Sequence, residues 1–205
     1  MHRIIVIGRG MIGSAAGRHL TGLTDGIALL GPDEPVERAA HAGVFASHYD
    51  EGRMTRIVDP DPDWSITAKR SIERYAEIEA ESGISFFTNS QYLGIAGTSS
   101  EYLARSEAQG RANGADTTRL DAGGIRARYP FLRVPDDAEG LHEGRSAGHI
   151  SPRAMVRAEC EAARRRGAAI IDAEAQAIRP VTGGVEVETA DGEIHRAEKV
   201  LVATG

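Results

Sequence analysis

The feature that most constrains the fold is a glycine-rich segment directly after a short apolar strand. Residues 3–7 read Arg-Ile-Ile-Val-Ile, a run without helical periodicity that is typical of a buried parallel strand. Residues 8–13 read Gly-Arg-Gly-Met-Ile-Gly, and an apolar-periodic helix is expected from there to about Gly22, followed by a strand at 27–30. This strand–turn–helix–strand unit predicts a dinucleotide site, because the glycines permit a tight turn, close approach to a pyrophosphate and close helix packing.

Two positions depart from the usual form of this motif. Arg9 stands where a small residue is common, and its side chain could either neutralise a phosphate or extend into solvent. The acid expected after the second strand, which would bind the ribose hydroxyls, is displaced by Gly31-Pro32. Asp33 is the candidate for that role, and the alternative is a polar turn without a ligand. No basic residue nearby is suited to a 2′-phosphate, which disfavours NADP.

Composition excludes several other classes of protein. Among 205 residues, 41% are apolar and 26% are charged, as in ordinary globular domains. The net charge of −6 argues against a nucleic-acid partner, and no apolar run is long enough to cross a membrane or to act as a signal peptide. The single cysteine, Cys160, excludes a disulfide framework and predicts a cytoplasmic location, and the seven histidines lack metal-ligand spacing, so no metal is expected.

The remaining chain predicts a mixture of helices and strands. The helices are expected from the Pro-rich residues 59–63 to about Gly83, over roughly 99–112, shortly before Tyr129, and from Pro152 to the arginines at 164–166. The strands are expected at 84–87 and 92–95 around an Asn89-Ser90 turn, at 169–171, in a hairpin at 185–197 that turns at Asp191-Gly192, and at 199–205.

Several local motifs are arranged in an order that goes beyond the glycine loop. Residues 47–56 read Ser-His-Tyr-Asp-Glu-Gly-Arg-Met-Thr-Arg, Tyr129-Pro130 ends a helix, residues 143–152 lead into the next helix, and Ala-Thr-Gly stands at 203–205. This order resembles the FAD-dependent amino-acid oxidase superfamily, and most of all its sarcosine oxidase and N-methyl amino-acid oxidase branch. The resemblance covers essentially the whole sequence, which looks like the N-terminal half of a longer protein.

The resemblance implies an α/β fold in which a Rossmann-like FAD-binding domain carries an inserted α+β portion of a substrate domain. The FAD-binding domain is expected to be discontinuous, at residues 1–82 and 151–205, with the substrate-domain portion at 83–150. FAD is the implied cofactor. The expected partner is a small amino-acid or amine substrate, and no nucleic acid or membrane partner is expected.

The resemblance also assigns roles to individual residues. The FAD pyrophosphate is expected at Gly8, Gly10, Met11, Ile12 and Gly13, the stretch from phosphate to ribityl chain at Ser47 and His48, the adenine at Ala175, and a further close approach at Gly205. Arg53 is expected beside the flavin ring as the catalytic residue, and Arg56 is expected to bind the substrate carboxylate. The alternative for Arg53 and Arg56 is a pair of surface arginines at helical spacing, after the acidic residues Asp50 and Glu51. Tyr49 replaces a second histidine of the family pattern.

The implied activity is oxidation of a small amino acid or N-methyl amino acid, by hydride transfer to flavin, imine hydrolysis and hydrogen peroxide formation. A second hypothesis is a non-catalytic FAD-binding fragment or subunit, completed by a second polypeptide that supplies the other half. A third, an NAD-dependent dehydrogenase, rests on the glycine loop alone. The hairpin and the Ala-Thr-Gly ending argue against this third hypothesis.

Overall fold

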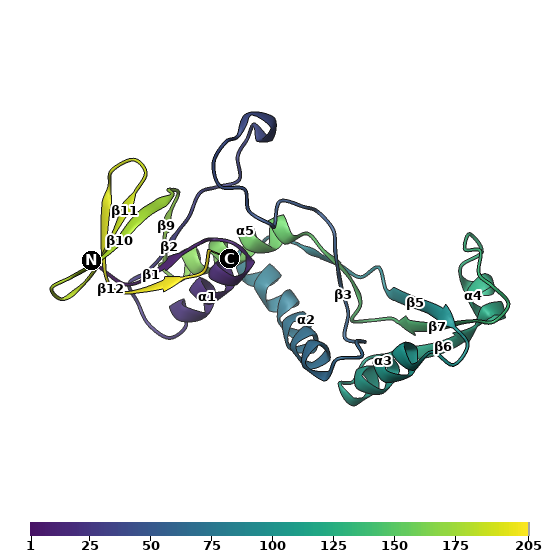
Figure 1. The fold of residues 1–205 in the computed structure, drawn as a ribbon. Helices are drawn as coiled ribbons and strands as arrows, with labels where there is room; N and C mark the ends of the chain where they lie inside the picture. The colour runs from purple at the N-terminus through teal and green to yellow at the C-terminus, as the bar shows by residue number, and fades with distance from the viewer. Residues whose placement is uncertain (205) are drawn as a thin grey trace. The chain divides into compact units, whose positions relative to one another are not determined.

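The computed structural model describes residues 1–204, which form two compact units (Figure 1). The first unit comprises Met1–Glu51, Glu77–Phe86 and the chain from Ser151 onward. The second unit comprises Gly52–Ala76 and Phe87–Ile150. Residues 52–76, which the sequence placed with the FAD-binding part, therefore group with the second unit, and helix α2 (Pro62–Ser82) contributes to both.

The first unit is built on a six-stranded sheet. Its strands are, in sheet order, β10 (Ala175–Val181), β11 (Gly184–Thr189), β12 (Ile194–Val202), β1 (His2–Ile7), β2 (Ile27–Leu30) and β9 (Ala169–Ile171). The four strands from β12 to β9 pair in parallel, whereas β10 and β11 pair in antiparallel fashion. The parallel strands follow the order third, second, first, fourth along the chain, which is the order of a doubly wound nucleotide-binding fold. The α/β fold class is confirmed.

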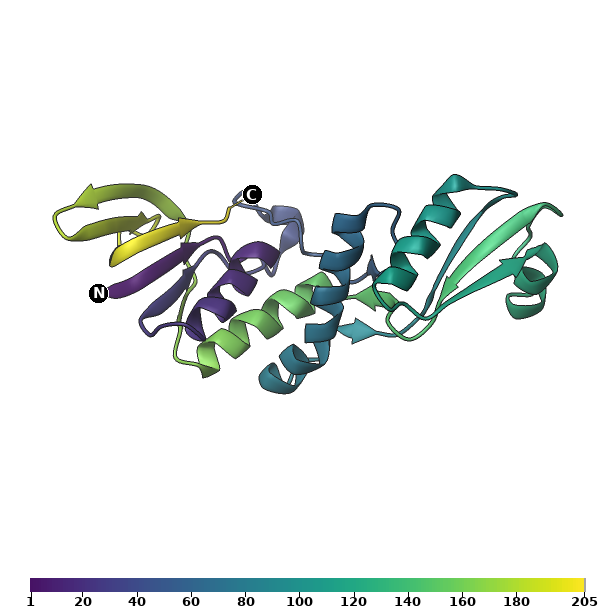
Figure 2. The ribbon, with the colours of Figure 1, turned by 90° about the horizontal axis from the view of Figure 1, so that it is seen from below.

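Helices α1 (Met11–Thr21) and α5 (Pro152–Arg165) lie side by side in the first unit (Figure 2). The sheet residues Ile27 and Leu29 are almost completely buried together with Ala163 of α5. Arg18 of α1 is 2% exposed and forms an ion pair with the equally buried Glu159 of α5. The two helices are therefore joined by apolar packing and by one buried charge pair.

Strand β12 corrects one expectation from the sequence. A hairpin return and a separate closing strand were expected, but Ile194–Val202 is one continuous strand. Its first part pairs with β11, where Val185 faces Ala197, and its second part pairs with β1, where Ile4 faces Lys199. The same strand therefore joins the antiparallel hairpin to the parallel sheet.

The second unit contains two three-stranded sheets. One has the order β3 (Arg53–Thr55), β8 (Gly148–Ile150), β4 (Phe87–Thr88), and the other β5 (Tyr92–Gly97), β7 (Ala138–Glu143), β6 (Thr117–Asp121). Leu103 of α3 (Glu101–Ala112) is buried with Leu141 of β7, and Ile125 of α4 (Ala122–Arg128) is buried with Ala138 at the start of the same strand. The expected pairing of 84–87 with 92–95 is wrong, because β4 pairs with β8 whereas β5 pairs with β7.

Candidate cofactor site

The first unit contains a cavity of about 1070 Å³ at the carboxyl ends of its parallel strands. The cavity is lined by residues of the glycine loop, of the segments after β2 and β12, of the loop at 44–49, and of β10. β1 and β12 are neighbours at the point where the strand order reverses, which is where open α/β sheets bind their ligands. Position and size thus mark the cavity as the candidate ligand site of the first unit.

Two glycines of the loop are required by the backbone around them. Gly8 has φ +101°, and a Cβ there would lie 2.4 Å from the carbonyl oxygen of Ala203. A Cβ at Gly13 would lie 1.7 Å from the carbonyl oxygen of Gly8. Two backbone hydrogen bonds also hold the loop, one from the Gly8 N–H to Leu30 O (2.8 Å) and one from the Ala203 N–H to Ile7 O (2.7 Å). The turn therefore has a fixed shape before any ligand arrives.

The N-terminus of α1 opens beside this turn. Its N-cap is Gly10, no side chain caps its N–H groups, and its first turn contains no acidic residue. A Cβ at Gly10 would meet only the His48 Nδ1 within 4 Å, at 3.9 Å, so this position is open, in contrast to Gly8 and Gly13. A helix N-terminus attracts anions, and a glycine without a crowded neighbour leaves the backbone accessible, so the residues present fit the pyrophosphate of FAD.

Ser47 and His48 also line the cavity, and His48 lies near Gly10 of the glycine loop. Arg153 at the start of α5 fixes the segment that carries them, because its guanidinium pairs with Glu34 (2.5 Å) and Glu51 and donates to the Tyr49 carbonyl oxygen (2.8 Å). Burial and the neighbouring Glu34 raise the pKa of the Tyr49 phenol. Sequence reasoning missed Arg153, because its partners lie more than a hundred residues away and no local motif marks it.

Arg9 and Asp33 are the two positions at which the sequence departs from the usual motif. The Arg9 side chain is only 9% exposed and lines the cavity, so the solvated alternative is wrong. Asp33 is 67% exposed, pairs with Arg9 at 2.5 Å, and is absent from the lining of the cavity. Ala175 does line the cavity, together with other residues at the start of β10.

Arg53 and Arg56 belong to the second unit. Arg53 lies in β3 opposite Ile150, whereas Arg56 pairs with Asp59 (3.1 Å) and lies 4.9 Å from the centre of the Tyr92 ring. The Nε of Arg56 is buried and has no hydrogen-bond partner within residues 1–204. Neither arginine is among the residues that line the cavity of the first unit, and their roles stay predictions.

Glu143 fixes the chain next to Arg56. Its carboxylate is completely buried and accepts hydrogen bonds from the N–H groups of Ile57 (3.0 Å) and Val58 (2.9 Å). Burial raises the pKa of this carboxyl group, while the two N–H donors and the charge of Arg56 oppose the rise. The residues directly after Arg56 are thereby bound to strand β7.

The structure thus brings together a subset of the expected residues. Around one cavity lie Gly8, Gly10, Ile12, Ser47, His48 and Ala175. Met11 and Gly13 belong to the first turn of α1, beside that cavity, and Gly205 lies outside the described residues. Within residues 1–204, no group of three His, Cys, Asp or Glu side chains is arranged to hold a metal, and no helix has the length and apolarity needed to cross a bilayer.

Known proteins resemble this chain both in sequence and in fold. N-methyl-L-tryptophan oxidase of Citrobacter koseri is 28% identical over 209 residues, which cover 98% of this chain and 53% of that protein. L-proline dehydrogenase from P. horikoshii shares the fold with a TM-score of 0.78 at 20% identity, and glycine oxidase from Bacillus cereus with 0.74 at 22%. These structures cover all of this chain, and it covers 53% and 57% of theirs. The chain spans about half the length of the relatives it matches.

The match to a protein family covers nearly the entire sequence. The family model described as FAD dependent oxidoreductase matches residues 3–205. The resemblance noted from the sequence motifs is confirmed, and so is FAD as the cofactor. The chain belongs to the family of FAD-dependent oxidoreductases.

Proposed function

We propose that this chain provides the FAD-binding part of an enzyme that oxidises a small amino acid or an N-methyl amino acid. The cavity at the β1–β12 crevice carries the proposal, because it combines an uncapped helix N-terminus with an uncrowded glycine backbone. The names of similar proteins, N-methyl-L-tryptophan oxidase and glycine oxidase, support the substrate class.

The residues of the first unit would hold the cofactor. The backbone at Gly8, Gly10 and Ile12 would bind the pyrophosphate, Ser47 and His48 the adjoining ribityl stretch, and Ala175 the adenine. When bound, FAD would supply the hydride acceptor for the carbon next to the substrate nitrogen and a route for the electrons to oxygen, with hydrogen peroxide as the product. Water would then hydrolyse the imine product. The protein's contribution is binding, orientation and charge.

The arginines of the second unit would provide the charges for the substrate and the flavin. A guanidinium can hold a carboxylate by two parallel hydrogen bonds, which fixes the orientation of an amino acid. The unpartnered buried Nε of Arg56 supports such a ligand, which would compete with Asp59 for the guanidinium. Arg53 would place positive charge beside the flavin ring.

The first experiment separates cofactor binding from turnover. The chain is titrated with FAD, flavin fluorescence is recorded, and the complex is then mixed without oxygen with N-methyl amino acids, glycine or proline. FAD binding followed by bleaching of the flavin, with peroxide on admission of air, supports the proposal. FAD binding without bleaching by any substrate favours a chain completed by a second polypeptide. Binding of NADH in place of FAD would overturn both.

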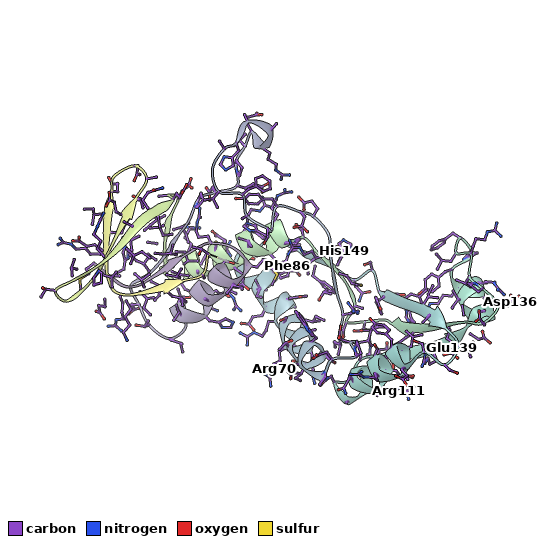
Figure 3. All side chains as sticks on the ribbon, in the orientation of Figure 1. Arg70, Phe86, Arg111, Asp136, Glu139 and His149 are labelled. Atoms are coloured by element: carbon purple, nitrogen blue, oxygen red, sulfur yellow. The ribbon has the colours of Figure 1, made fainter. Side chains whose placement is uncertain are left out.

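A second experiment tests Arg56. In a preparation that turns over, Arg56→Lys should raise the substrate KM while leaving the Kd for FAD unchanged, because lysine keeps the charge but loses the fork of donors. Arg70→Lys is the matched control, since Arg70 is an exposed residue of α2 (Figure 3). Equal losses of substrate and FAD binding would contradict the role given to Arg56.

A further inference from the structure

An ion cluster borders the cavity where the segments after β2 and β9 meet the glycine loop. Arg9 donates from Nε to the Gly31 carbonyl oxygen (2.7 Å), and its Nη2 lies 2.5 Å from Asp33 and 3.6 Å from Asp172. The N–H of Asp33 also donates to the Asp172 carboxylate at 2.7 Å. One cation is thus held between two carboxylates and a carbonyl oxygen.

Gly31 makes room for this arrangement. It stands where an acid usually ends the second strand, and a Cβ there would lie 2.9 Å from the Arg9 backbone nitrogen and 3.3 Å from its Cγ. An aspartate or glutamate at position 31 would therefore displace Arg9. This end of the cavity therefore carries the guanidinium of Arg9, where the usual motif has a carboxylate.

The orientation of the cluster determines which member can meet a ligand. Arg9 lines the cavity, whereas Asp33 and Asp172 do not and are 67% and 60% exposed. Nη1 of Arg9 makes no hydrogen bond to any atom of residues 1–204, so donors remain while Nε and Nη2 are occupied. A side chain that is 9% exposed, with free donors, can serve a ligand that enters the cavity.

We propose that Arg9 contacts the adenosine ribose of FAD, and that Asp33 and Asp172 are positioning residues that act through Arg9. The proposal rests on FAD binding in this cavity and replaces Asp33 as the expected ribose contact. Ribose hydroxyl oxygens accept hydrogen bonds as well as donate them, so a guanidinium can take the place of a carboxylate. Because two carboxylates outweigh the single guanidinium, the cluster does not attract a 2′-phosphate.

The first test compares FAD with FMN, which has the flavin and a phosphate but no adenosine. Arg9→Gln should raise the Kd for FAD about 10- to 100-fold, the loss expected for a hydrogen bond to a charged group, and leave the Kd for FMN unchanged. Arg164→Gln is the control, because Arg164 pairs with Glu161 on the exposed side of α5, away from the cavity. Equal effects of Arg9→Gln on FAD and FMN would overturn the proposal.

A double-mutant cycle separates Arg9 from Asp33. Asp33→Asn should weaken FAD binding in the natural sequence and have no further effect once Arg9→Gln is present, because Asp33 acts only by holding Arg9. The same result is expected for Asp172→Asn. If Asp33→Asn costs as much in the Arg9→Gln background as in the natural sequence, Asp33 meets the ribose directly and the proposal is wrong.

A third test compares two ligands on the natural sequence, so its result does not depend on whether a variant folds. The Kd for adenosine diphosphate should be lower than the Kd for its 2′,3′-dideoxy form by a factor of about ten or more, because the dideoxy form leaves the Arg9 donors unpaired. Equal affinities would overturn the ribose contact. FAD binding that is unaffected by Arg9→Gln refutes this inference alone, whereas absence of any FAD binding by the natural sequence refutes the proposed function.

Discussion

Alanine substitutions at Gly10 and Gly13 should separate the two tasks of the glycine loop. A methyl group at Gly13 would lie 1.7 Å from the Gly8 carbonyl oxygen, whereas the same group at Gly10 meets only the His48 Nδ1, at 3.9 Å. Gly13→Ala must therefore move backbone, because the atoms that the methyl group would overlap are the carbonyl carbon and oxygen of Gly8. Gly10→Ala leaves the fold intact and fills the space next to the helix N-terminus.

The magnitudes follow from these distances. Overpacking typically costs about 1–3 kcal/mol, and backbone overlap places Gly13→Ala at about 3 kcal/mol, or roughly 6–12 °C in Tm for a chain of this size. Gly10 has φ −75° and ψ −170°, which alanine adopts readily. The loss of a glycine N-cap and the lower entropy of an unfolded alanine offset each other, so Gly10→Ala should change stability by less than about 1 kcal/mol.

The assay measures thermal unfolding without FAD and flavin titration with it. Gly13→Ala should lower the Tm of the apoprotein. Gly10→Ala should keep the Tm but raise the Kd for FAD by about tenfold or more, since a methyl group now meets the pyrophosphate. If Gly10→Ala binds FAD as tightly as the natural sequence, the pyrophosphate does not lie against Gly10. If Gly13→Ala unfolds at the natural Tm, the packing argument fails.

Three further predictions concern buried groups. Arg18→Met should lower the free energy of unfolding in urea by about 3–5 kcal/mol, because it leaves the buried charge of Glu159 unpaired. Adding Glu159→Met should restore most of this loss, and a double variant as unstable as Arg18→Met would contradict the pairing. Burial and the charge of Arg128 lower the pKa of His142 from 6.5, so on acidification the histidine is protonated in the unfolded chain before it is protonated in the folded one. The free energy of unfolding in urea should therefore fall as the pH drops below about 6.5, and His142→Gln should remove this part of the pH dependence. Burial raises the pKa of Cys160 to about 11, so a thiol reagent at pH 8 should modify Cys160 only after unfolding, and rapid modification of the folded chain would be the contrary result.

The strand–turn–helix unit at the start of the chain was predictable because all its information is local. The β-branched run, the glycines and the periodic helix each favour the same structure over thirty consecutive residues. The Ser151 cap and the Pro152 start of α5 were predictable for the same reason, and the Ser151 hydroxyl does accept from the Ala154 N–H.

Strand β10 was not predicted, because Pro180 lies within it and proline normally argues against a strand. The sheet order places β10 at an edge, where a proline can be accommodated without breaking a central ladder. Strand β7 was missed for another reason. It ends in His142 and Glu143, which look like surface residues in the sequence but are both buried between neighbouring strands.

The contacts around Arg9 lie beyond sequence reasoning altogether. Asp33 and Asp172 reach Arg9 from the ends of two different strands, and only the strand order brings these ends together. The sequence allowed a phosphate contact or a solvated side chain for Arg9, and the structure shows a partly buried side chain that is ion-paired with Asp33. The ion pairs of Arg9 therefore depend on the order of the strands in the sheet and not on the residue type at position 9.

The pairing of β1 with β12 has a consequence for synthesis of the protein in the cell. The bond from the Ala203 N–H to Ile7 O joins positions nearly two hundred residues apart. A ribosome that adds about 5–20 residues per second needs roughly 10–40 s to pass from the first position to the second. During that interval the glycine loop has been synthesised, but strand β12, which pairs with β1 beside it, has not. A nascent polypeptide should therefore acquire affinity for FAD late and abruptly, so that flavin capture reports completion of the sheet.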